Sequence, residues 1–410
     1  MPLTDRHFPP TPVVTASGHA ARYDDTWARV RPLLRRVPVT RVVDLTPIDP
    51  LGLPVWSAVT PLARDLTVHA GKGATAAAAR LSAVMEAIER VTAEDVDPAR
   101  VVRASYESLR ARAGDAAVDP ASLDLPFDTT YRPDLPIDWL DAWDLARGEP
   151  AWVPLDAVIS PAREGVCRGV ETNGLASGNT LTEAAVHALY ELIERDAVAD
   201  DAFCEAFGEP GDPHGAAPRM VDVDSLPDAT RPWLARLRDA GMEVHVKDLT
   251  HDTGVPVYAA YLVDPAFPGA AREAAFEGMG CDLLPSRAAV RAVTEVVQAH
   301  AVRMLGARDA YEGFEAPPER AALLLRRIGE RYAARRAPFP DDPPTPGDLR
   351  ADLDAIVARL RAAGLARCLV ADLTRADLGV PVVRAIVPGL AGPFGDTARR
   401  PTPRLLRRLV

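Results

Sequence analysis

The sequence predicts an α+β fold, with antiparallel β-hairpins packed against helices, in a single domain that spans residues 1–410. Three observations support this prediction. A hairpin-like segment occurs three times, three other segments have helical periodicity, and 48% of the residues are hydrophobic, which is enough to bury a large core. Because the hairpins alternate with helices without the regular order of a doubly wound parallel sheet, we expect antiparallel pairing.

The repeated segment reads as a strand, a turn containing Asp and Gly, and a second strand. Its copies occupy residues 42–55, 246–257 and 370–382, and each contains Asp-Leu-Thr, then Gly, then Pro-Val. Runs of β-branched residues on either side of such a turn are typical of hairpins. Chance similarity between three hairpins is the alternative interpretation.

Helices are predicted at residues 75–95, 180–205 and 285–305, which are rich in Ala, Leu, Val and Glu at a period of 3.6 residues. The stretches 115–137 and 316–348 contain many Pro, Asp and Arg residues. We expect these two stretches to form surface loops or connectors around short helices.

Composition excludes several classes of function. The net charge of -11 argues against a basic surface that grips nucleic acid or anionic lipid. No apolar run is long enough to span a membrane and the N-terminus lacks a signal-peptide core, so we expect a cytoplasmic protein. The four cysteines lie far apart without a C-x-x-C pair, which predicts neither a disulfide framework nor a zinc site. Lysine is rare, and the two lysines are Lys72 and Lys247.

The first candidate motif combines Gly-Lys-Gly at residues 71–73 with the helix that follows. On a helical wheel, Ser82, Glu86 and Glu89 fall within about 60° of one another, which gives one acidic face. An ordinary solvated helix face is the alternative for this helix alone.

The second candidate motif is a polar, glycine-punctuated loop at residues 171–179 and the helix after it. The loop contains Asn173, and the helix carries Glu183, His187, Glu191, Glu194 and Arg195. The string Glu-x-x-Glu-Arg therefore occurs on two helices. Two converging pairs of carboxylates would repel one another without a cation between them, and Mg²⁺, which prefers oxygen ligands, is the natural occupant.

The third candidate motif is a helix with Arg291, Glu295 and Gln298 on one side. Gln298 could read an adenine or ribose edge, and Arg291 could neutralise phosphate. A salt-bridged structural face is the alternative for any single Arg/Glu pair.

Other kinds of site fit the sequence less well. Glu183, His187, Glu191 and Glu194 resemble the ligands of di-iron helical bundles, but such sites need Glu-x-x-His on two helices, and here the spacing is Glu-x-x-x-His on one. A packed or hydrogen-bonded His187 is the better interpretation. Residues 71–73 are not a Walker loop, because the four-residue spacer and the following hydroxyl are missing.

At these three segments the sequence resembles the YcaO family. The first family motif is matched by residues 71–73 with 82–90, the second by 173–178 with 183–196, and the third by 291–298 with 306–309. The resemblance covers a core of about residues 60–395 and leaves a basic, proline-containing tail at 396–410. It implies a YcaO-like fold and an enzyme that uses ATP and Mg²⁺ to phosphorylate a backbone amide oxygen of a ribosomally synthesised peptide or protein.

In this family a nucleophile then replaces the activated oxygen, and the nucleophile sets the product. A Cys, Ser or Thr side chain gives an azoline, sulfide gives a thioamide, and an amine gives an amidine. Phosphorylation supplies the leaving group that an amide oxygen lacks, and Mg²⁺ neutralises charge on the transferred phosphoryl group. By the resemblance, the metal ligands are Glu86, Glu89, Glu191 and Glu194. The residues around the nucleotide are Lys72, Ser82, Asn173, Glu183, Arg195, Arg291, Glu295 and Gln298.

The two ends of the chain influence the choice of product. Azoline-forming members commonly end in a proline-rich tail that reaches the active site, whereas this chain ends in a basic tail at 396–410, and we expect no fused leader-binding domain. Both features favour thioamide formation over cyclodehydration, with a TfuA-like or leader-binding partner protein, a precursor peptide as substrate and a homodimer as the assembly. A di-metal helical oxidoreductase and a non-catalytic peptide-binding scaffold are the remote alternatives.

Overall fold

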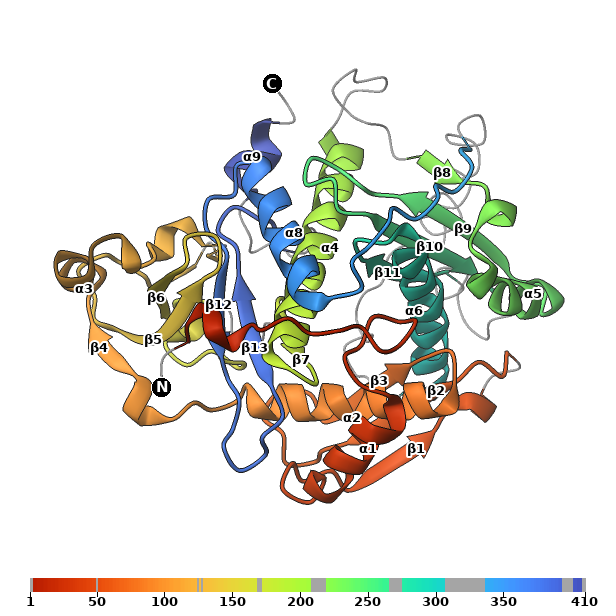
Figure 1. The fold of residues 1–410 in the computed structure, drawn as a ribbon, viewed down its shortest axis with the longest axis horizontal. Helices are drawn as coiled ribbons and strands as arrows, with labels where there is room; N and C mark the ends of the chain where they lie inside the picture. Colours follow the sequence, from red (N-terminus) through yellow and green to blue (C-terminus); the bar gives the residue numbers. More distant parts are fainter. Residues whose placement is uncertain are drawn as a thin grey trace.

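A computed structural model describes residues 3–48, 51–123, 125–126, 128–167, 172–207, 219–264, 275–306, 336–392 and 401–407 (Figure 1). In these residues, helices pack against three antiparallel sheets, so the predicted α+β architecture is confirmed. Residues 307–309 of the third motif and most of the predicted loop at 316–348 lie outside the described residues.

The first sheet has three strands in the order β1-β2-β3. Their bounds are Arg41–Asp44, Val55–Val59 and Val68–Lys72. The helix that follows β3 is α2 (Ala76–Thr92), and it packs on β2 and β3. Thr75 begins this helix because its side chain accepts a hydrogen bond from the Ala78 N–H. The shorter α1 (Tyr23–Val30) contacts α2 (Figure 1).

The second sheet has the order β11-β10-β9-β8. In chain order its strands are β8 (Arg219–Val221), β9 (Glu243–Asp248), β10 (Val257–Val263) and β11 (Ala275–Cys281). The helix that follows β11 is α6 (Pro285–Leu305), which packs on β10 and β11, while α5 (Arg231–Asp239) lies beside β9.

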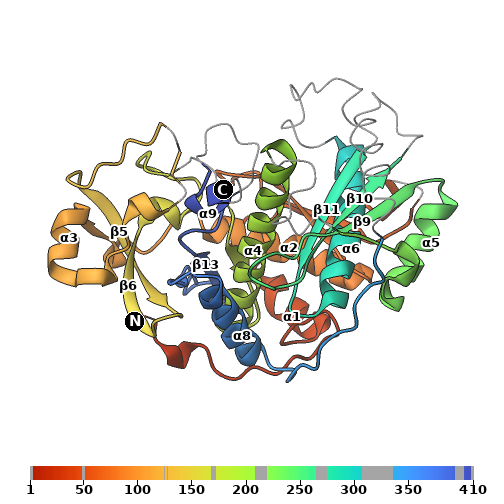
Figure 2. The same cartoon turned by 90° about the horizontal axis from the view of Figure 1, so that it is seen from above.

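The third sheet has the order β4-β5-β12-β13-β7, and β6 also pairs with β5. Its strands are β4 (Val102–Ala104), β5 (Ile137–Asp144), β6 (Glu149–Pro154), β7 (Leu175–Ser177), β12 (Leu369–Asp372) and β13 (Val382–Ile386). The helix that follows β7 is α4 (Leu181–Phe207), which packs on β7 and β13 and on α8 (Leu349–Ala362). Seen from above, α4 lies between this sheet and the second one (Figure 2).

The remaining elements are short. The helices α3 (Tyr106–Ala113) and α9 (Pro403–Leu406) complete the α-helices named in the figures. Short 3₁₀ helices occupy Asp5–His7, Arg31–Leu33, Thr46–Ile48, Pro98–Arg100, Gly114–Ala116, Pro120–Ser122, Leu155–Ala157, Val223–Ser225 and Asp228–Thr230.

The three predicted hairpins are confirmed as β1/β2, β9/β10 and β12/β13. In each hairpin the aspartate Oδ1 accepts a hydrogen bond from the backbone N–H two residues later, at 2.9 Å for Asp44, 2.9 Å for Asp248 and 2.8 Å for Asp372. The glycine of each turn has a positive φ, at 59°, 64° and 62° for Gly52, Gly254 and Gly379. The repeat is therefore one local structure used three times.

The repeat extends beyond the hairpin to a third strand and a helix. The residue that opens the second strand pairs with Lys72 on β3, with Cys281 on β11 and with Ser177 on β7. From each of these three positions, the next helix places candidate site residues at the same offsets of ten, fourteen and seventeen residues. The sets are Ser82, Glu86 and Glu89 on α2, His187, Glu191 and Glu194 on α4, and Arg291, Glu295 and Gln298 on α6. We call each unit of three strands and one helix a module.

Glycine allows the third strand to lie against its helix. A Cβ atom built on Gly71 would lie 2.1 Å from the Ala83 nitrogen of α2, and one on Gly280 would lie 2.1 Å from the Ala288 oxygen of α6. Any larger residue at these two positions would push strand and helix apart.

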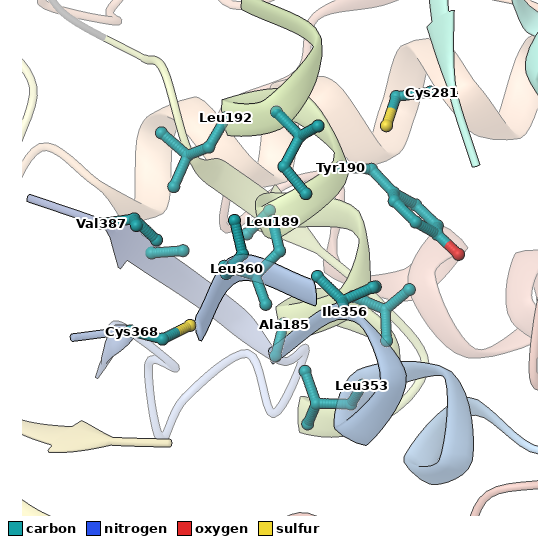
Figure 3. Close-up of a cluster of buried hydrophobic side chains, with 14 of the residues drawn as sticks. Ala185, Leu189, Tyr190, Leu192, Cys281, Leu353, Ile356, Leu360, Cys368 and Val387 are labelled. Carbon is teal, nitrogen blue, oxygen red and sulfur yellow. The ribbon is translucent and has the colours of Figure 1, made fainter. Parts of the chain in front are cut away.

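The core around α4 fixes the helix that carries Glu191 and Glu194. Leu189 of α4 packs against Leu353, Ile356 and Leu360 of α8 in one buried cluster (Figure 3). Fully buried aliphatic side chains hold a helix in one rotational setting, because turning it would expose them to water. Two of the four cysteines, Cys281 and Cys368, are also buried. In the described part of the chain, no helix is long and apolar enough to cross a membrane.

Candidate functional site

The helix of each module contacts the third strand of another module, and the three contacts close a ring. Helix α6 lies against β3, α2 lies against β7, and α4 lies against β11. The candidate residues at the equivalent offsets therefore meet where the three modules join.

At the contact between α6 and β3, the Lys72 ammonium forms an ion pair with the Glu295 carboxylate. Two residues before Lys72 on β3, the Ala70 carbonyl accepts a hydrogen bond of 2.6 Å from the side-chain amide of Gln298. Lys72, Glu295 and Gln298, which the sequence predicts to share one site, therefore lie at the same contact. The side chain of Gln298 is engaged with backbone, which the sequence alone did not indicate.

At the contact between α2 and β7, Glu89 Oε2 accepts hydrogen bonds from the Ser177 N–H at 2.8 Å and from the Ser177 hydroxyl at 3.1 Å. Glu86 accepts from the Ala70 N–H and from Arg90 Nε, both at 3.2 Å. These bonds hold the two carboxylates of α2 at fixed positions.

At the contact between α4 and β11, the Tyr190 hydroxyl accepts a hydrogen bond of 3.1 Å from the Leu283 N–H. Glu194 is 6% exposed. Burial and the neighbouring charge of Glu194 raise the pKa of the Cys281 thiol well above its ordinary value, so this thiol is a packing group and not a nucleophile.

The carboxylates of α2 and α4 lie close enough to oppose each other's ionisation. Burial, Glu191 and Glu86 raise the pKa of Glu89 to about 8. Burial raises the pKa of Glu191 to about 7. The charge of Arg195 lowers this pKa, and the charge of Glu194 raises it. Burial and Glu295 raise the pKa of Glu194 as well. Negative charge gathered in this way favours a cation.

Cationic side chains lie on the α6 side of the same cluster. Although burial opposes it, the charges of Lys72, Arg195 and Arg291 lower the pKa of Glu295. Arg195 Nη2 lies 3.8 Å from Glu194 Oε1. The four glutamates therefore lie on α2 and α4, and the cations beside them come from α4 (Arg195), α6 (Arg291) and β3 (Lys72).

Glu183 lies in the first turn of α4, more than two turns before Glu191. It is 2% exposed, and its oxygens accept hydrogen bonds from His19 Nδ1 at 2.9 Å, from the Ala20 N–H at 3.2 Å and from Asn179. These donors and the nearby His187 outweigh burial and lower the pKa of Glu183 to about 2. No pattern in the sequence pointed to His19 as its partner.

Among the described residues, His19, Glu183 and His187 are the set of three whose potential ligand atoms all lie within 4.8 Å of one another. The four glutamates are spaced more widely. Burial and the positive charges of His19, Arg291 and Arg287 lower the pKa of His187 to about 3, although Glu183 opposes this shift. Glu183 already accepts hydrogen bonds from His19, Ala20 and Asn179, so the cluster fits a hydrogen-bonded junction better than a metal centre.

The last two candidate residues, Ser82 and Asn173, are half-buried. Ser82 lies on α2 one turn before Glu86. The Asn173 carbonyl accepts a hydrogen bond of 2.8 Å from Arg384 Nη1, and Arg384 Nε donates to the Val158 carbonyl at 3.0 Å. Sequence reasoning missed Arg384, because one arginine in a hydrophobic strand of an arginine-rich chain gives no signal.

The donor set fits magnesium bound together with phosphate. Mg²⁺ usually keeps several waters and is held by one or two carboxylates plus phosphate oxygens. Widely spaced carboxylates next to Lys72, Arg195 and Arg291 match that requirement, because the cations can take the phosphate charge that the metal leaves uncompensated.

Comparison with known proteins identifies the family. The family described as YcaO cyclodehydratase, ATP- and Mg²⁺-binding, matches residues 70–391. The chain belongs to the YcaO family. It is 36% identical over 392 residues to an uncharacterised protein of Methanothermobacter thermautotrophicus, which covers 90% of this chain and 94% of that protein. It is 33% identical over 375 residues to an uncharacterised protein of the tfuA 3′ region of Rhizobium leguminosarum bv. trifolii, which covers 89% and 86%.

Solved structures of YcaO proteins share this fold. YcaO from Methanopyrus kandleri, bound with AMPPCP and Mg²⁺, matches with a TM-score of 0.71 and 27% identity over 95% of this chain and 97% of that one. A heterocyclase in complex with substrate and cofactor matches in fold, with a TM-score of 0.74 and 24% identity over 96% of this chain and 56% of the heterocyclase. The YcaO-like fold predicted from the motifs is confirmed.

Family membership also gives the class of activity. ATP and Mg²⁺ are the cofactors, as predicted, and the chain is an ATP-dependent enzyme of the cyclodehydratase type that acts on peptides. Which residues of this chain hold the nucleotide and the metal stays a prediction.

Proposed function

We propose that this YcaO protein phosphorylates a backbone amide oxygen of a peptide or protein with ATP and that sulfide then replaces the oxygen to give a thioamide. The closeness of Glu89 on α2 to Glu191 on α4, and of Glu194 to Lys72 and Arg195, supports the ATP-dependent step. The similarity to the protein of the tfuA 3′ region favours the thioamide product and a TfuA-like partner.

In this proposal the four glutamates hold magnesium: Glu86, Glu89, Glu191 and Glu194. The nucleotide is surrounded by Lys72, Ser82, Asn173, Glu183, Arg195, Arg291, Glu295 and Gln298. Magnesium would neutralise the phosphates and polarise the bond to the transferred phosphoryl group. The ion pair of Lys72 with Glu295 fixes the ammonium at the edge of β3, where it can accept phosphate charge.

Chemistry at the amide needs a leaving group and a nucleophile. Transfer of the γ-phosphoryl group to the amide oxygen forms an O–P bond, and ADP leaves. The nucleophile then adds to the former carbonyl carbon, and phosphate leaves with the original oxygen. With hydrogen sulfide the product keeps the peptide chain intact and carries sulfur in place of oxygen.

Cyclodehydration is the second candidate, and it is favoured by the similarity in fold to a heterocyclase. The described part of the C-terminal tail, residues 401–407, contains α9 and packs against the rest of the protein. Arg404 Nη1 lies 2.6 Å from Asp196 Oδ2 of α4, and Arg404 also pairs with Asp252. An amidine product stays open as a further alternative.

The proposal also covers the domain, the location and the assembly of the protein. The chain acts as one domain over residues 1–410, in the cytoplasm, as a homodimer with a separate partner that presents the peptide. Size-exclusion chromatography with light scattering tests the dimer.

The decisive experiment is mass spectrometry of a candidate peptide incubated with the protein, ATP, Mg²⁺ and sulfide. Thioamidation adds about 16 Da because sulfur replaces the activated oxygen. Cyclodehydration removes about 18 Da because the peptide loses water. Omission of ATP should abolish either change. A mass gain in the absence of ATP, or ATP binding without any peptide product across the tested partners, would contradict the proposal.

A further inference from the structure

A cavity of about 110 Å³ lies beside the third module, where β13 ends. Its lining residues are Leu123, Pro126, Asp156, Ala157, Cys167, Asn173, Leu192, Ala385, Ile386, Val387, Pro388, Gly389, Leu390 and Gly392. None of the described residues in this lining is an arginine or a lysine. The walls formed by the described residues are mostly aliphatic, and the continuous segment 385–390 contributes to them.

The polar side chain of Asp156 in the lining is already engaged. Its carboxylate accepts hydrogen bonds from the Arg163 N–H at 2.7 Å, from the Glu164 N–H at 3.0 Å and from the Val166 N–H at 3.0 Å. Asp156 thus shapes the loop that leads to Cys167. The cavity therefore offers apolar surface in place of a charged group.

Arg384 connects this cavity with the candidate site. Its guanidinium is 2% exposed, and it donates to the carbonyl of Asn173, which lines the cavity. It also lies close enough to Glu191, Glu89 and Cys167 for each of them to affect its pKa, which burial lowers to about 10. The buried guanidinium of Arg384 therefore bonds to the cavity wall and interacts electrostatically with Glu191 and Glu89.

The repeat shows that Arg384 is not required by the hairpin itself. The equivalent strand positions, two residues after the start of β2 and of β10, hold Ser57 and Ala259. Only the third module combines an arginine at this position with the cavity beside it. The difference points to a function specific to this module.

We propose that this cavity binds an aliphatic side chain of the peptide substrate, on a residue next to the amide that is activated. This inference rests on the proposed function and names a substrate preference of the same site. A cavity of about 150 Å³ lined by aliphatic and aromatic side chains can hold benzene, so the smaller cavity here suits a side chain of the size of valine or leucine.

The first test uses wild-type protein and N-acetyl amino-acid N-methylamides as probes. Saturation-transfer NMR should show binding in the order leucine, then alanine, then glycine, with tryptophan weaker than leucine because it exceeds the cavity. Equal signals for glycine and leucine would overturn the inference. Displacement of the leucine probe by AMPPCP with Mg²⁺ would also overturn it, because the cavity would then belong to the nucleotide.

The second test changes the wall. Cys167→Phe places a ring in the cavity and should weaken leucine-probe binding by about tenfold or more. Cys167→Ala should retain binding, and Cys204→Phe on α4 is the matched control, since it adds the same ring outside the lining. Retained binding in Cys167→Phe would contradict the inference.

Calorimetry with AMPPCP and Mg²⁺ separates this inference from the proposed function. If AMPPCP binds and the leucine probe does not, only the side-chain site fails. If AMPPCP fails to bind to wild-type protein, the proposed nucleotide site fails, whatever the probe does.

Discussion

Helices α2 and α4 resemble each other more than either resembles α6, although all three occupy equivalent places in their modules. At offsets fourteen and seventeen, α2 and α4 carry two glutamates, whereas α6 carries Glu295 and Gln298. At offset ten, α6 carries Arg291 where the other two have Ser82 and His187. The repeated module sets the geometry, and these differences give α2 and α4 two carboxylates each, whereas α6 carries one carboxylate and one guanidinium.

The backbone group that each helix meets explains part of this difference. Glu89 of α2 faces the Ser177 N–H and must accept a hydrogen bond, whereas Gln298 of α6 faces the Ala70 carbonyl and must donate one. A glutamate at position 298 would place two acceptors against each other.

The largest effect is expected for the glutamates of α2 and α4. Glu191→Gln should weaken binding of AMPPCP with Mg²⁺ by about 100-fold or more, because it removes a charged metal ligand while leaving the side-chain shape. Isothermal calorimetry measures this change, and circular dichroism checks the fold. Glu107→Gln on α3 is the matched control, since it removes one exposed carboxylate outside the three modules. Equal affinity in wild type and Glu191→Gln would remove Glu191 from the metal site.

A smaller effect is expected for the α6 side. Gln298→Glu leaves the Ala70 carbonyl without its donor, which costs about 1–3 kcal/mol and should weaken AMPPCP binding by about tenfold. Gln298→Met removes the donor without adding charge, so comparison of the two variants separates the lost bond from the added charge. If both variants bind AMPPCP as the wild type does, the tie between α6 and β3 does not support the site.

The smallest effect concerns pH. In the protein without metal, the pKa of Glu89 is raised to about 8, so the folded state holds an extra proton that the unfolded state has lost above its own pKa. This contribution to stability is present at low pH and disappears as the pH rises through 8. Glu89→Gln should therefore match wild type at pH 5 and melt about 3 °C higher at pH 8.5.

Addition of Mg²⁺ with AMPPCP should reverse the order at pH 8.5, because ionised Glu89 then has a cation partner. Thermal unfolding followed by circular dichroism measures both comparisons. A constant difference between the two proteins from pH 5 to pH 8.5 would show that Glu89 does not titrate in this range.

Local structure was predictable from the sequence, because Asx-turn residues, glycines and the 3.6-residue period are local signals. The three hairpins and the helices α2, α4 and α6 follow them closely. The wheel positions of Glu86, Glu89, Glu191 and Glu194 also predicted that carboxylates would face one another. The closed ring was not predictable, since the contact of α6 with β3 joins Gln298 to Ala70 across most of the sequence.

Two further features could not be read from the sequence for different reasons. The partnership of His19 with Glu183 depends on a segment without periodicity, which packs beside α4 only in the folded protein. Arg384 gave no signal because its importance comes from burial beside Asn173 and Glu191. Sequence periodicity reports which face of an element is buried, but it does not report which single polar group is buried with it.

The third module differs from the other two in chain order, and this difference affects how the protein is made. Its third strand β7 and its helix α4 come before its hairpin β12/β13 in the sequence, and the whole second module lies between them. During synthesis α4 therefore emerges before the strands that cover it. The edge of β7 and one apolar face of α4 stay without their partners until β12 and β13 have been translated. The first and second modules can assemble as they emerge, whereas the third module is completed only when residues 369–386 have been translated.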